Sequence, residues 1–312
     1  MASVKNIGLW LVSAPARLAK SRLAKRFVTN PTSLAGLLLL FAFIVIAALA
    51  PVLAPPPRAG YNPYMIPRDS YINEPQPPSK AHPLGTTSSQ YDIYYGLVWG
   101  TRTAFRVGLI VTAAAAVIGI VIGSIAAFYG GLVDELMMRV TDIFMTIPFL
   151  IAAMVLVTIL GQGLDKVMIA LIAFGWMGYA RLIRSDILSI KELDYVSAAR
   201  ALGAGDARII LRHIIPNAIF PTIITATMSA GSMVITASSL SFLGLGAPLG
   251  YADWGQMISF SRHWMLGTQG NPAQYWYTVI YPGAAILLFC LSWNLMGDAF
   301  RDILDPRLRG TH

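Results

Sequence analysis

The sequence predicts an all-α integral membrane protein with six transmembrane helices. Three observations carry this prediction: an apolar composition, uncharged stretches long enough to span a bilayer, and a biased distribution of Lys and Arg. Of the 312 residues, 56% are hydrophobic and only 12% are charged, whereas soluble domains carry roughly 25% charged residues. The mean hydropathy is +0.62. So few charges cannot form the polar surface of a soluble particle of this size.

Five uncharged stretches exceed the roughly 20 residues that a helix needs to cross about 30 Å of hydrocarbon. They are 27–57, 107–133, 143–164, 214–252 and 264–297. A sixth stretch, 167–180, has only fourteen residues, which by length alone also fits a buried or re-entrant segment. Its flanking Lys166, Arg181 and Arg184 have long side chains that reach the membrane interface while the helix itself spans.

The Lys and Arg residues decide between five and six spans. With six spans and a cytoplasmic N-terminus, sixteen of the 23 lie in the cytoplasm. The other seven lie outside: Arg58, Arg68, Lys80, Arg102, Arg106, Lys166 and Arg262. With five spans, eight are inside and fifteen outside, which opposes the positive-inside rule. The rule therefore favours six spans and a multi-pass protein with both termini in the cytoplasm.

The N-terminal elements follow from charge and length. Residues 1–33 form a basic cytoplasmic segment, in which the apolar and basic spacing of 17–26 fits either a short helix on the inner leaflet or a solvated topology signal. Residues 34–53 form the first transmembrane helix. This helix is expected to be retained, because the apolar stretch is too long for the 7 to 15 residues of a signal-peptide core and ends in a proline cluster.

Residues 54–105 form an extracytoplasmic region rich in proline and aromatic residues. Ten of the nineteen prolines lie between Pro51 and Pro83, so this part is an extended loop that either meets an external partner or merely connects two spans. The aromatic stretch 91–107 suits an interfacial helix that leads into the second span. Residues 106–312 hold the other five transmembrane helices and a long cytoplasmic loop at about 185–216.

The absence of known phosphate-binding, nucleophile and metal-binding motifs excludes several classes of function. No G-x-x-x-x-G-K-[ST] phosphate loop and no Gly-x-Ser-x-Gly elbow occur. Four histidines are scattered singly, and Cys290 is the only cysteine, so no internal disulfide forms and a metal site is not expected. We therefore expect no enzymatic activity, no cofactor and no metal in this chain. The spans also lack the clustered charges of proton relays, which argues against a secondary carrier.

The loop 185–216 is the most informative segment. Apolar residues at helical spacing place Leu193, Val196, Ala199 and Leu202 on one face. The flexible Gly203 and Gly205 follow, and the apolar pattern then resumes at Ile209, Ile210 and Ile214. Two short helices should therefore meet at a glycine turn. The small residues allow another protein to approach the backbone closely, although a loop that packs only on its own chain fits the same pattern.

The loop resembles the EAA loop of ATP-binding-cassette (ABC) importer permeases. That pattern reads Glu-Ala-Ala, a glycine four positions later, and I-x-L-P ten positions after the glycine. The matching residues are Ala198, Ala199, Gly203, His213, Ile215 and Pro216, with Ser197 in the place of the glutamate. The surrounding DYVSAARALGAGDARIILRHIIPN resembles the peptide-transporter branch (oligopeptide, dipeptide and nickel). A salt bridge or cap made by the missing carboxylate is expected to be absent or taken over by Asp194 or Glu192.

Three further stretches resemble the second, or C-type, permease subunit of that branch. They are HPLGT (82–86), SLSFLGLG (239–246) followed by Trp254 and Gly255, and NLMGDAFRDILDPRLRG (294–310). The chain departs from the family after HPLGT, where the usual D-x-x-G-R-D is reduced to Asp92. The resemblance implies the type I (MetI-like) permease fold with an extra N-terminal span and an outer loop, in a bacterial or archaeal cytoplasmic (inner) membrane.

The resemblance also implies the partners and the substrate class. A second homologous permease, two ATP-binding cassette ATPase subunits that bind ATP and Mg, and an extracytoplasmic solute-binding protein would work with this chain in the lipid bilayer, and no nucleic acid is involved. The residues implied to dock the ATPases are Ser197, Ala198, Ala199, Leu202, Gly203, Asp206 and Pro216. Di- or oligopeptides are the expected substrate. Nickel, glutathione and oligosaccharides are the alternatives within the family.

The sequence also fits other functions and other roles for individual residues. A stand-alone channel or secondary carrier would transport without partners, and a membrane-embedded assembly subunit would not affect uptake. Asp142 is expected to pair locally or to cap a helix, with a gating role as the alternative. Six aromatic residues before the last span are expected to form an interfacial belt rather than to contact ligand. They are Tyr251, Trp254, Trp264, Tyr275, Trp276 and Tyr277.

Overall fold

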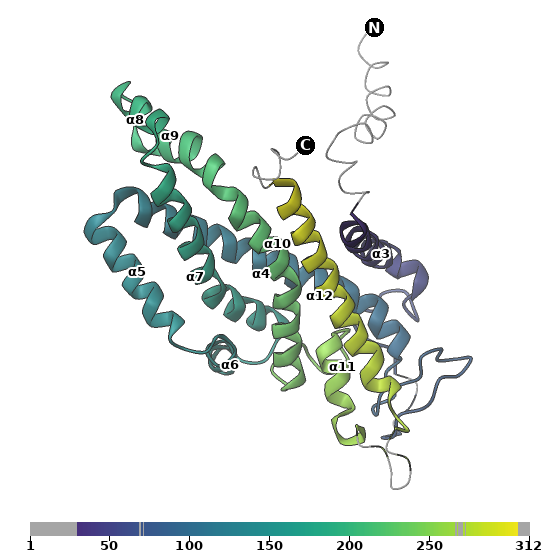
Figure 1. The fold of residues 1–312 in the computed structure, drawn as a ribbon. Coiled ribbons are helices and arrows are strands. Elements are labelled where there is room, and N and C mark those ends of the chain that lie inside the picture. Colours follow the sequence, from purple (N-terminus) through teal and green to yellow (C-terminus); the bar gives the residue numbers. More distant parts are fainter. Residues whose placement is uncertain are drawn as a thin grey trace.

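The protein is described here from a computed structural model that covers residues 30–304 except 69, 71, 266, 268–270 and 272. The predicted surface helix at 17–26 and the last residues of the basic C-terminus lie outside the described residues. Within them the chain is helical, with three isolated β-bridges and no strand. The expected all-α architecture is confirmed (Figure 1).

The helices follow one another along the chain with short connections, apart from the loop between α3 and α4 and the segments 243–253 and 265–276 on either side of α11 and η2. The elements are α3 (Pro31–Leu53), α4 (Ile93–Tyr129), α5 (Gly131–Met145), α6 (Phe149–Leu160), α7 (Leu164–Ile190), α8 (Asp194–Ala201), α9 (Asp206–Ile209), the π-helical turn η1 (Ile210–Ile214), α10 (Ile215–Phe242), α11 (Trp254–Phe260), the 3-10 turn η2 (Arg262–Trp264) and α12 (Tyr277–Leu304). Figure 1 shows α7, α10, α12 and α3 arranged in this order across the molecule, with α5 and α6 at the other flank.

Five helical segments of the described chain are long and apolar enough to cross a membrane alone. They are α3, α4, α7, the continuous run from α9 through α10, and α12. The expected third span, 143–164, is not one straight helix. It is divided between α5 and α6, which meet at an angle of 85° across Thr146–Pro148 and provide a sixth span if the pair is counted as one. The bend lies at Pro148, whose ring disfavours helical continuation through it.

The short stretch 167–180 belongs to the 27-residue helix α7, which supports its assignment as a span. Helix α7 packs closely on α4. A Cβ atom added at Gly123 would lie 2.3 Å from the carbonyl oxygen of Ala180, and one at Gly119 would lie 2.6 Å from the carbonyl oxygen of Trp176. These two glycines, four residues apart, let the two helix backbones approach as small residues do in membrane bundles.

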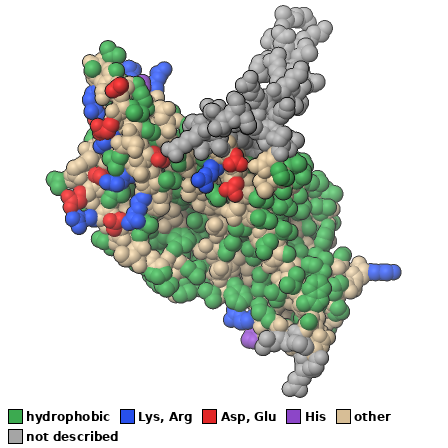
Figure 2. Space-filling view, in the orientation of Figure 1, with side chains coloured by type: hydrophobic (Ala, Val, Ile, Leu, Met, Phe, Trp, Pro, Cys, Tyr) green, Lys and Arg blue, Asp and Glu red, His purple; other side chains and the backbone are tan. Residues whose placement is uncertain are grey.

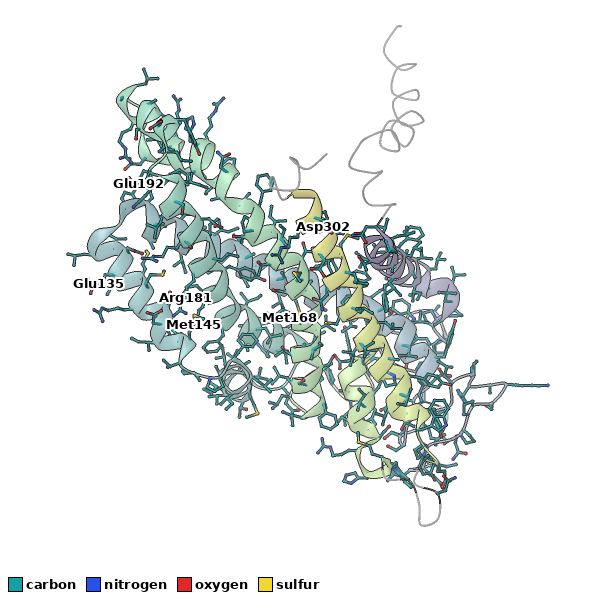
Figure 3. All side chains as sticks on the ribbon, viewed as in Figure 1. Glu135, Met145, Met168, Arg181, Glu192 and Asp302 are labelled. Carbon is teal, nitrogen blue, oxygen red and sulfur yellow. The ribbon has the colours of Figure 1, made fainter. Side chains whose placement is uncertain are left out.

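The N-terminal span α3 lies against α12. Asn30 caps α3 by accepting a hydrogen bond from the Thr32 amide, and its side-chain amide donates to Asp302 near the end of α12 at 3.3 Å. Figure 3 shows Asp302 beside the start of α3. A Cβ atom at Gly36 would lie 2.5 Å from the Cβ atom of Leu295. The extra span is therefore packed tightly on the last helix.

The outer loop between α3 and α4 is more than a connector, because it packs on the segment before α11. Met65 forms a β-bridge with Tyr251, the Ile66 amide donates to the Gly250 carbonyl at 2.7 Å, and the Ile66 side chain is buried. Asp92, the acid kept after the HPLGT motif, caps α4 and also lies 2.6 Å from the His82 imidazole. This part of the motif therefore holds the loop to the helix.

The aromatic residues near α4 and α11 form a core rather than an interfacial belt. The stretch 91–107 is not a separate interfacial helix, because α4 runs through it without a break and buries Tyr95 and Trp99. Of the six residues predicted to form a belt, Trp254, Tyr275 and Tyr277 are buried, whereas Trp276 is half exposed. The prediction of an interfacial belt was therefore wrong for Trp254, Tyr275 and Tyr277.

Asp253 caps α11 from a fully buried position. Its carboxylate accepts a hydrogen bond from the Gln256 amide at 2.8 Å. Removal from water disfavours the charged carboxylate, so burial raises the pKa of Asp253 to about 6. The cap fixes the first turn of α11, a helix that packs against α10 and α4.

Charges are separated from the apolar flank of the bundle. Figure 2 shows Lys, Arg, Asp and Glu side chains gathered over α8, α9 and α5, and hydrophobic side chains over the flank where α3 lies. The outer loop and α11 lie at the opposite end from α8 and α9 (Figure 1).

Candidate functional site

Helices α8 and α9 form a hairpin that projects from one end of the bundle (Figure 1). The predicted pair of short helices around a glycine turn is thus confirmed. Asp194 lies in the first turn of α8 and Arg200 in its last turn, an arrangement that complements the helix dipole. The local sequence therefore favours a short helix that ends before residue 202.

The turn of the hairpin is a Schellman motif, which explains its glycine. The Gly203 amide donates to the carbonyl of Arg200 at 3.0 Å, and the Ala204 amide donates to the carbonyl of Ala199 at 3.1 Å. Gly203 has φ +81°, a left-handed conformation that glycine adopts without a steric penalty. Among the described residues, and apart from Gly203 and its two neighbours in the sequence, no atom lies within 4 Å of a Cβ atom added at Gly203. The turn is therefore open to a partner.

The inner side of the hairpin is anchored in the apolar core. Val196, Ile209 and Ile214 are buried, with no more than 1% of each side chain exposed. They share one cluster with Ala127 of α4, Ile183 and Ile187 of α7, and Ala218 of α10. Burial of each such side chain contributes about 1.5 to 3 kcal/mol, so the cluster holds the hairpin firmly to these helices.

The outer side of the hairpin is exposed and partly apolar. Leu202 is 89% exposed, and Ala198 lies on the side of α8 away from Val196. The predicted apolar face is thus only partly buried, since Leu193 and Leu202 point to the outside while Val196 points inward. Of the predicted docking residues, Ala199 is half-buried and the others are exposed: Ser197, Ala198, Leu202, Gly203, Asp206 and Pro216.

Polar contacts fix the hairpin at the start of α10. The side-chain amide of Asn217 donates to the His213 carbonyl at 2.7 Å, and the Tyr195 hydroxyl donates to the same carbonyl at 3.5 Å. On the other side, the Lys191 ammonium donates to the Ala127 carbonyl at 3.0 Å. Tyr195 thus joins α8 to η1 just before α10, and Lys191, which follows α7, joins the base of the hairpin to α4.

Ser197 occupies the glutamate position of the EAA pattern, so a neighbouring carboxylate would have to form the ion pair that a glutamate there would form. Neither Asp194 nor Glu192 forms an ion pair with another residue of the described part of the chain. The expected takeover of the missing ion pair by one of these acids is therefore not seen. Both carboxylates are exposed, and Figure 3 shows Glu192 at the base of the hairpin.

Sequence reasoning missed the ion pairs that join α5 to α7. Arg184 forms a bidentate pair with Asp134, with both N–O distances at 2.5 Å. Asp142 pairs with Arg181 of α7 rather than with a local partner. The two parallel N–H···O contacts between Arg184 and Asp134 fix α5 against α7. Charged residues on either side of the expected third span were the available signal, but sequence alone gives no pairing across 39 to 50 residues.

Comparison with known sequences agrees with this architecture. The family described as the binding-protein-dependent transport system inner membrane component matches residues 119–310, which is more than half of the chain. The chain belongs to this permease family. A second family, the N-terminal transmembrane domain of oligopeptide transport permease C, matches residues 21–78. The fold is therefore that of the type I (MetI-like) ABC importer permeases, with the C-type N-terminal extension.

Individual permeases are similar over nearly the whole chain. The dipeptide transport system permease protein DppC of Alkalihalophilus pseudofirmus is 36% identical over 91% of this chain and 89% of its own length. The oligopeptide transport system permease protein OppC of Bacillus subtilis is 34% identical over 91% and 88%. The glutathione transport system permease protein GsiD of Pectobacterium atrosepticum is 35% identical over 91% and 90%.

The family motif at 239–246 has a packing role in this permease. Leu245 donates its amide to the Leu240 carbonyl at 3.0 Å, which closes the end of α10 around Gly244 at φ +85°. A Cβ atom at Gly255 would lie 2.1 Å from the Ser238 carbonyl oxygen. The motif therefore brings α11 into direct contact with α10.

Proposed function

We propose that this permease is a subunit of an ATP-driven importer that takes up di- or oligopeptides by alternating access. The observation that carries the proposal is the exposed hairpin, capped by Gly203 and anchored by buried side chains to α4, α7 and α10. The names of the similar permeases support the peptide substrate. Glutathione is the second candidate, because a permease named for it is 35% identical to this chain.

The hairpin would transmit force from the ATPases to the spans. Ser197, Ala198, Leu202 and the turn at Gly203 would lie in a surface groove of an ATPase subunit. Closure of two ATPase subunits on ATP would then push the hairpin, and the buried cluster would pass this displacement to α7 and α10. The result is a rigid-body rocking of packed helices.

The remaining parts of the importer would be separate chains. ATP and Mg would bind to two ATPase subunits, since this chain carries no phosphate loop. A second, homologous permease would complete the pathway, and an extracytoplasmic solute-binding protein would deliver the peptide to the end of the bundle that carries α11 and the outer loop. The lipid bilayer of the cytoplasmic membrane would surround α3 and the outer faces of the other spans.

Reconstitution tests the proposal. Proteoliposomes that contain this chain, a second permease, the ATPases and the solute-binding protein should accumulate a labelled dipeptide only when ATP is supplied. The chain alone should neither transport nor hydrolyse ATP above background. Uptake by the chain alone would contradict the proposal and favour a secondary carrier. Competition with unlabelled oligopeptides and with glutathione would distinguish the two substrate candidates.

The same proposal fixes the orientation of the two ends of the bundle. A cysteine at Gly205, whose φ of −69° suits any residue and whose Cβ would meet open space, should react only with thiol reagents that enter the cytoplasm. A cysteine at the exposed Lys80 should react from outside. Both variants would carry Cys290→Ser. Labelling of the Gly205→Cys variant from the outside of sealed cells would contradict the proposed orientation.

A further inference from the structure

We infer that the crevice between α3, α4 and α12 binds an anionic phospholipid, with the lipid phosphate at Arg102 and an acyl chain along the apolar wall. The crevice holds about 480 Å³ of open space. It lies towards the end of the bundle that carries the outer loop, because Arg102 is in the first third of α4 and its partners are in the last turns of α3.

The position of Arg102 follows from a proline in α3. Pro51 has no amide hydrogen, so the carbonyl of Ala47, four residues earlier, has no partner within its own helix. The Arg102 side chain supplies the missing donor, with Nε at 2.5 Å from the Ala47 oxygen and Nη2 at 3.3 Å from the Ala48 oxygen. Arg102 therefore satisfies a backbone group that would otherwise be unpaired in the membrane.

These contacts leave the charge of Arg102 without a counter-ion. Its guanidinium also lies 4.9 Å from the centroid of the Trp99 ring. Among the described residues no carboxylate pairs with it, because Asp165 pairs with the neighbouring Arg106 at 2.7 Å. A cation in an apolar crevice is costly unless an anion or several hydrogen bonds compensate it. Two guanidinium nitrogens with remaining N–H groups match the oxygens of a phosphate.

The remaining walls of the crevice suit an acyl chain. The apolar lining comes from three helices: Leu40 and Ile44 of α3, Phe105 and Leu109 of α4, and Trp293 of α12. The outer face of α3 is highly apolar, with Phe41 61% and Val52 75% exposed, and Figure 2 shows this flank covered by hydrophobic side chains. A lipid of the surrounding bilayer reaches the crevice without crossing a polar layer, which makes it a better occupant than a protein carboxylate.

The test uses the full chain with its co-purifying subunits in nanodiscs that contain equal amounts of phosphatidylglycerol and phosphatidylcholine with the same acyl chains. Native mass spectrometry then counts the lipids that remain bound. The wild-type chain should retain phosphatidylglycerol in preference to phosphatidylcholine. Arg102→Gln should lower the retained phosphatidylglycerol about tenfold, the effect of losing one charge-assisted contact, whereas Arg102→Lys should keep most of it.

Two further variants separate the crevice from general electrostatics. Arg106→Gln removes the same charge one turn along α4, at a residue that pairs with Asp165 and does not line the crevice, and should retain the lipid. Ala48→Trp fills the crevice while keeping Arg102 and should release the lipid. Glutamine at 102 still offers an amide donor to the Ala47 carbonyl, and a monodisperse elution profile would confirm folding.

Three results would overturn the inference. The first is that the wild-type complex retains no more phosphatidylglycerol than phosphatidylcholine, as expected if a protein partner fills the crevice. The Arg102→Gln and Arg106→Gln variants could lose the lipid equally. The Ala48→Trp variant could retain as much lipid as the wild type.

Discussion

Replacing Ala198 with tryptophan should abolish ATP-driven uptake while the chain still inserts into the membrane. Ala198 is exposed on α8, on the side away from the buried Val196. If this surface lies in an ATPase groove, an indole ring there holds the two proteins apart. Overpacking of a close interface costs about 1 to 3 kcal/mol, so association of the ATPases should weaken about ten- to hundredfold. Co-purification of the ATPases and peptide uptake in proteoliposomes measure the two effects.

Ala81→Trp is the matched control for this variant. Ala81 is an exposed alanine in the loop at the opposite end of the bundle, where no ATPase would bind. The same substitution there should leave ATPase binding unchanged. Full ATPase binding and transport by Ala198→Trp would show that α8 is not the docking surface, and the proposed mechanism would lose its main residue-level support.

A tryptophan at Ala198 tests the docking surface more specifically than one at Ala199 or Gly203 would. Ala199 is half-buried, so a tryptophan there would also disturb the hairpin itself. Gly203 has φ +81°, and any side chain at that position adds backbone strain of roughly 1 kcal/mol to the effect of its bulk. At Ala198 only the contact with a partner changes.

The spans and the hairpin could be predicted because each rests on a local rule. A run of apolar residues predicts a membrane helix from its length alone, and Gly203 after a short amphipathic run predicts a helix end. Even the short stretch 167–180 was assigned correctly, because the positive-inside rule used charges beyond the stretch. The helix end predicted at Gly203 is formed by the two Schellman hydrogen bonds that the carbonyls of Arg200 and Ala199 accept.

The broken third span could not be predicted, because its shape depends on contacts far along the chain. The uncharged run 143–164 hides the bend at Pro148, and α5 begins twelve residues before that run. Helix α5 is held to α7 by the pairs of Asp134 with Arg184 and of Asp142 with Arg181. A hydropathy profile shows where charged residues lie in the sequence, but it does not show which of them form ion pairs in the fold.

The buried aromatics and the lone cation of the crevice were missed for a related reason. An interfacial belt and an aromatic core have the same composition, and the burial depends on contacts between segments far apart in the sequence, such as those of Trp254 with Phe43 and Phe289. Arg102 appeared in the sequence as one of seven outer charges. Its role depends on the free carbonyl of Ala47 that Pro51 leaves, 55 residues before Arg102, a relation that no local pattern shows.

Substituting leucine for Gly123 should prevent the bundle from folding. A Cβ atom at this position would lie 2.3 Å from the Ala180 carbonyl oxygen and 2.5 Å from a methyl carbon of Ile183. The first of these atoms belongs to the backbone of α7 and cannot rotate away, so α4 and α7 would have to separate along the interface that Gly119 and Gly123 create. We expect a loss well above the 1 to 3 kcal/mol that is typical of overpacking. Size-exclusion chromatography in mild detergent should show aggregate in place of a monodisperse peak.

Gly178→Leu provides the control, because it makes the same change within the same helix pair. Gly178 lies in α7, and in the described part of the chain no atom beyond its sequence neighbours and the adjacent backbone of α7 lies within 4 Å of a Cβ atom added there. Leucine also has the higher helix propensity, by about 0.8 to 1 kcal/mol. This variant should therefore elute as the wild type does and unfold at the same or a higher temperature. If Gly123→Leu were as stable as Gly178→Leu, α4 and α7 could not be as close as described. The hairpin, which is anchored on these two helices through Ala127, Ile183 and Ile187, would then need another support.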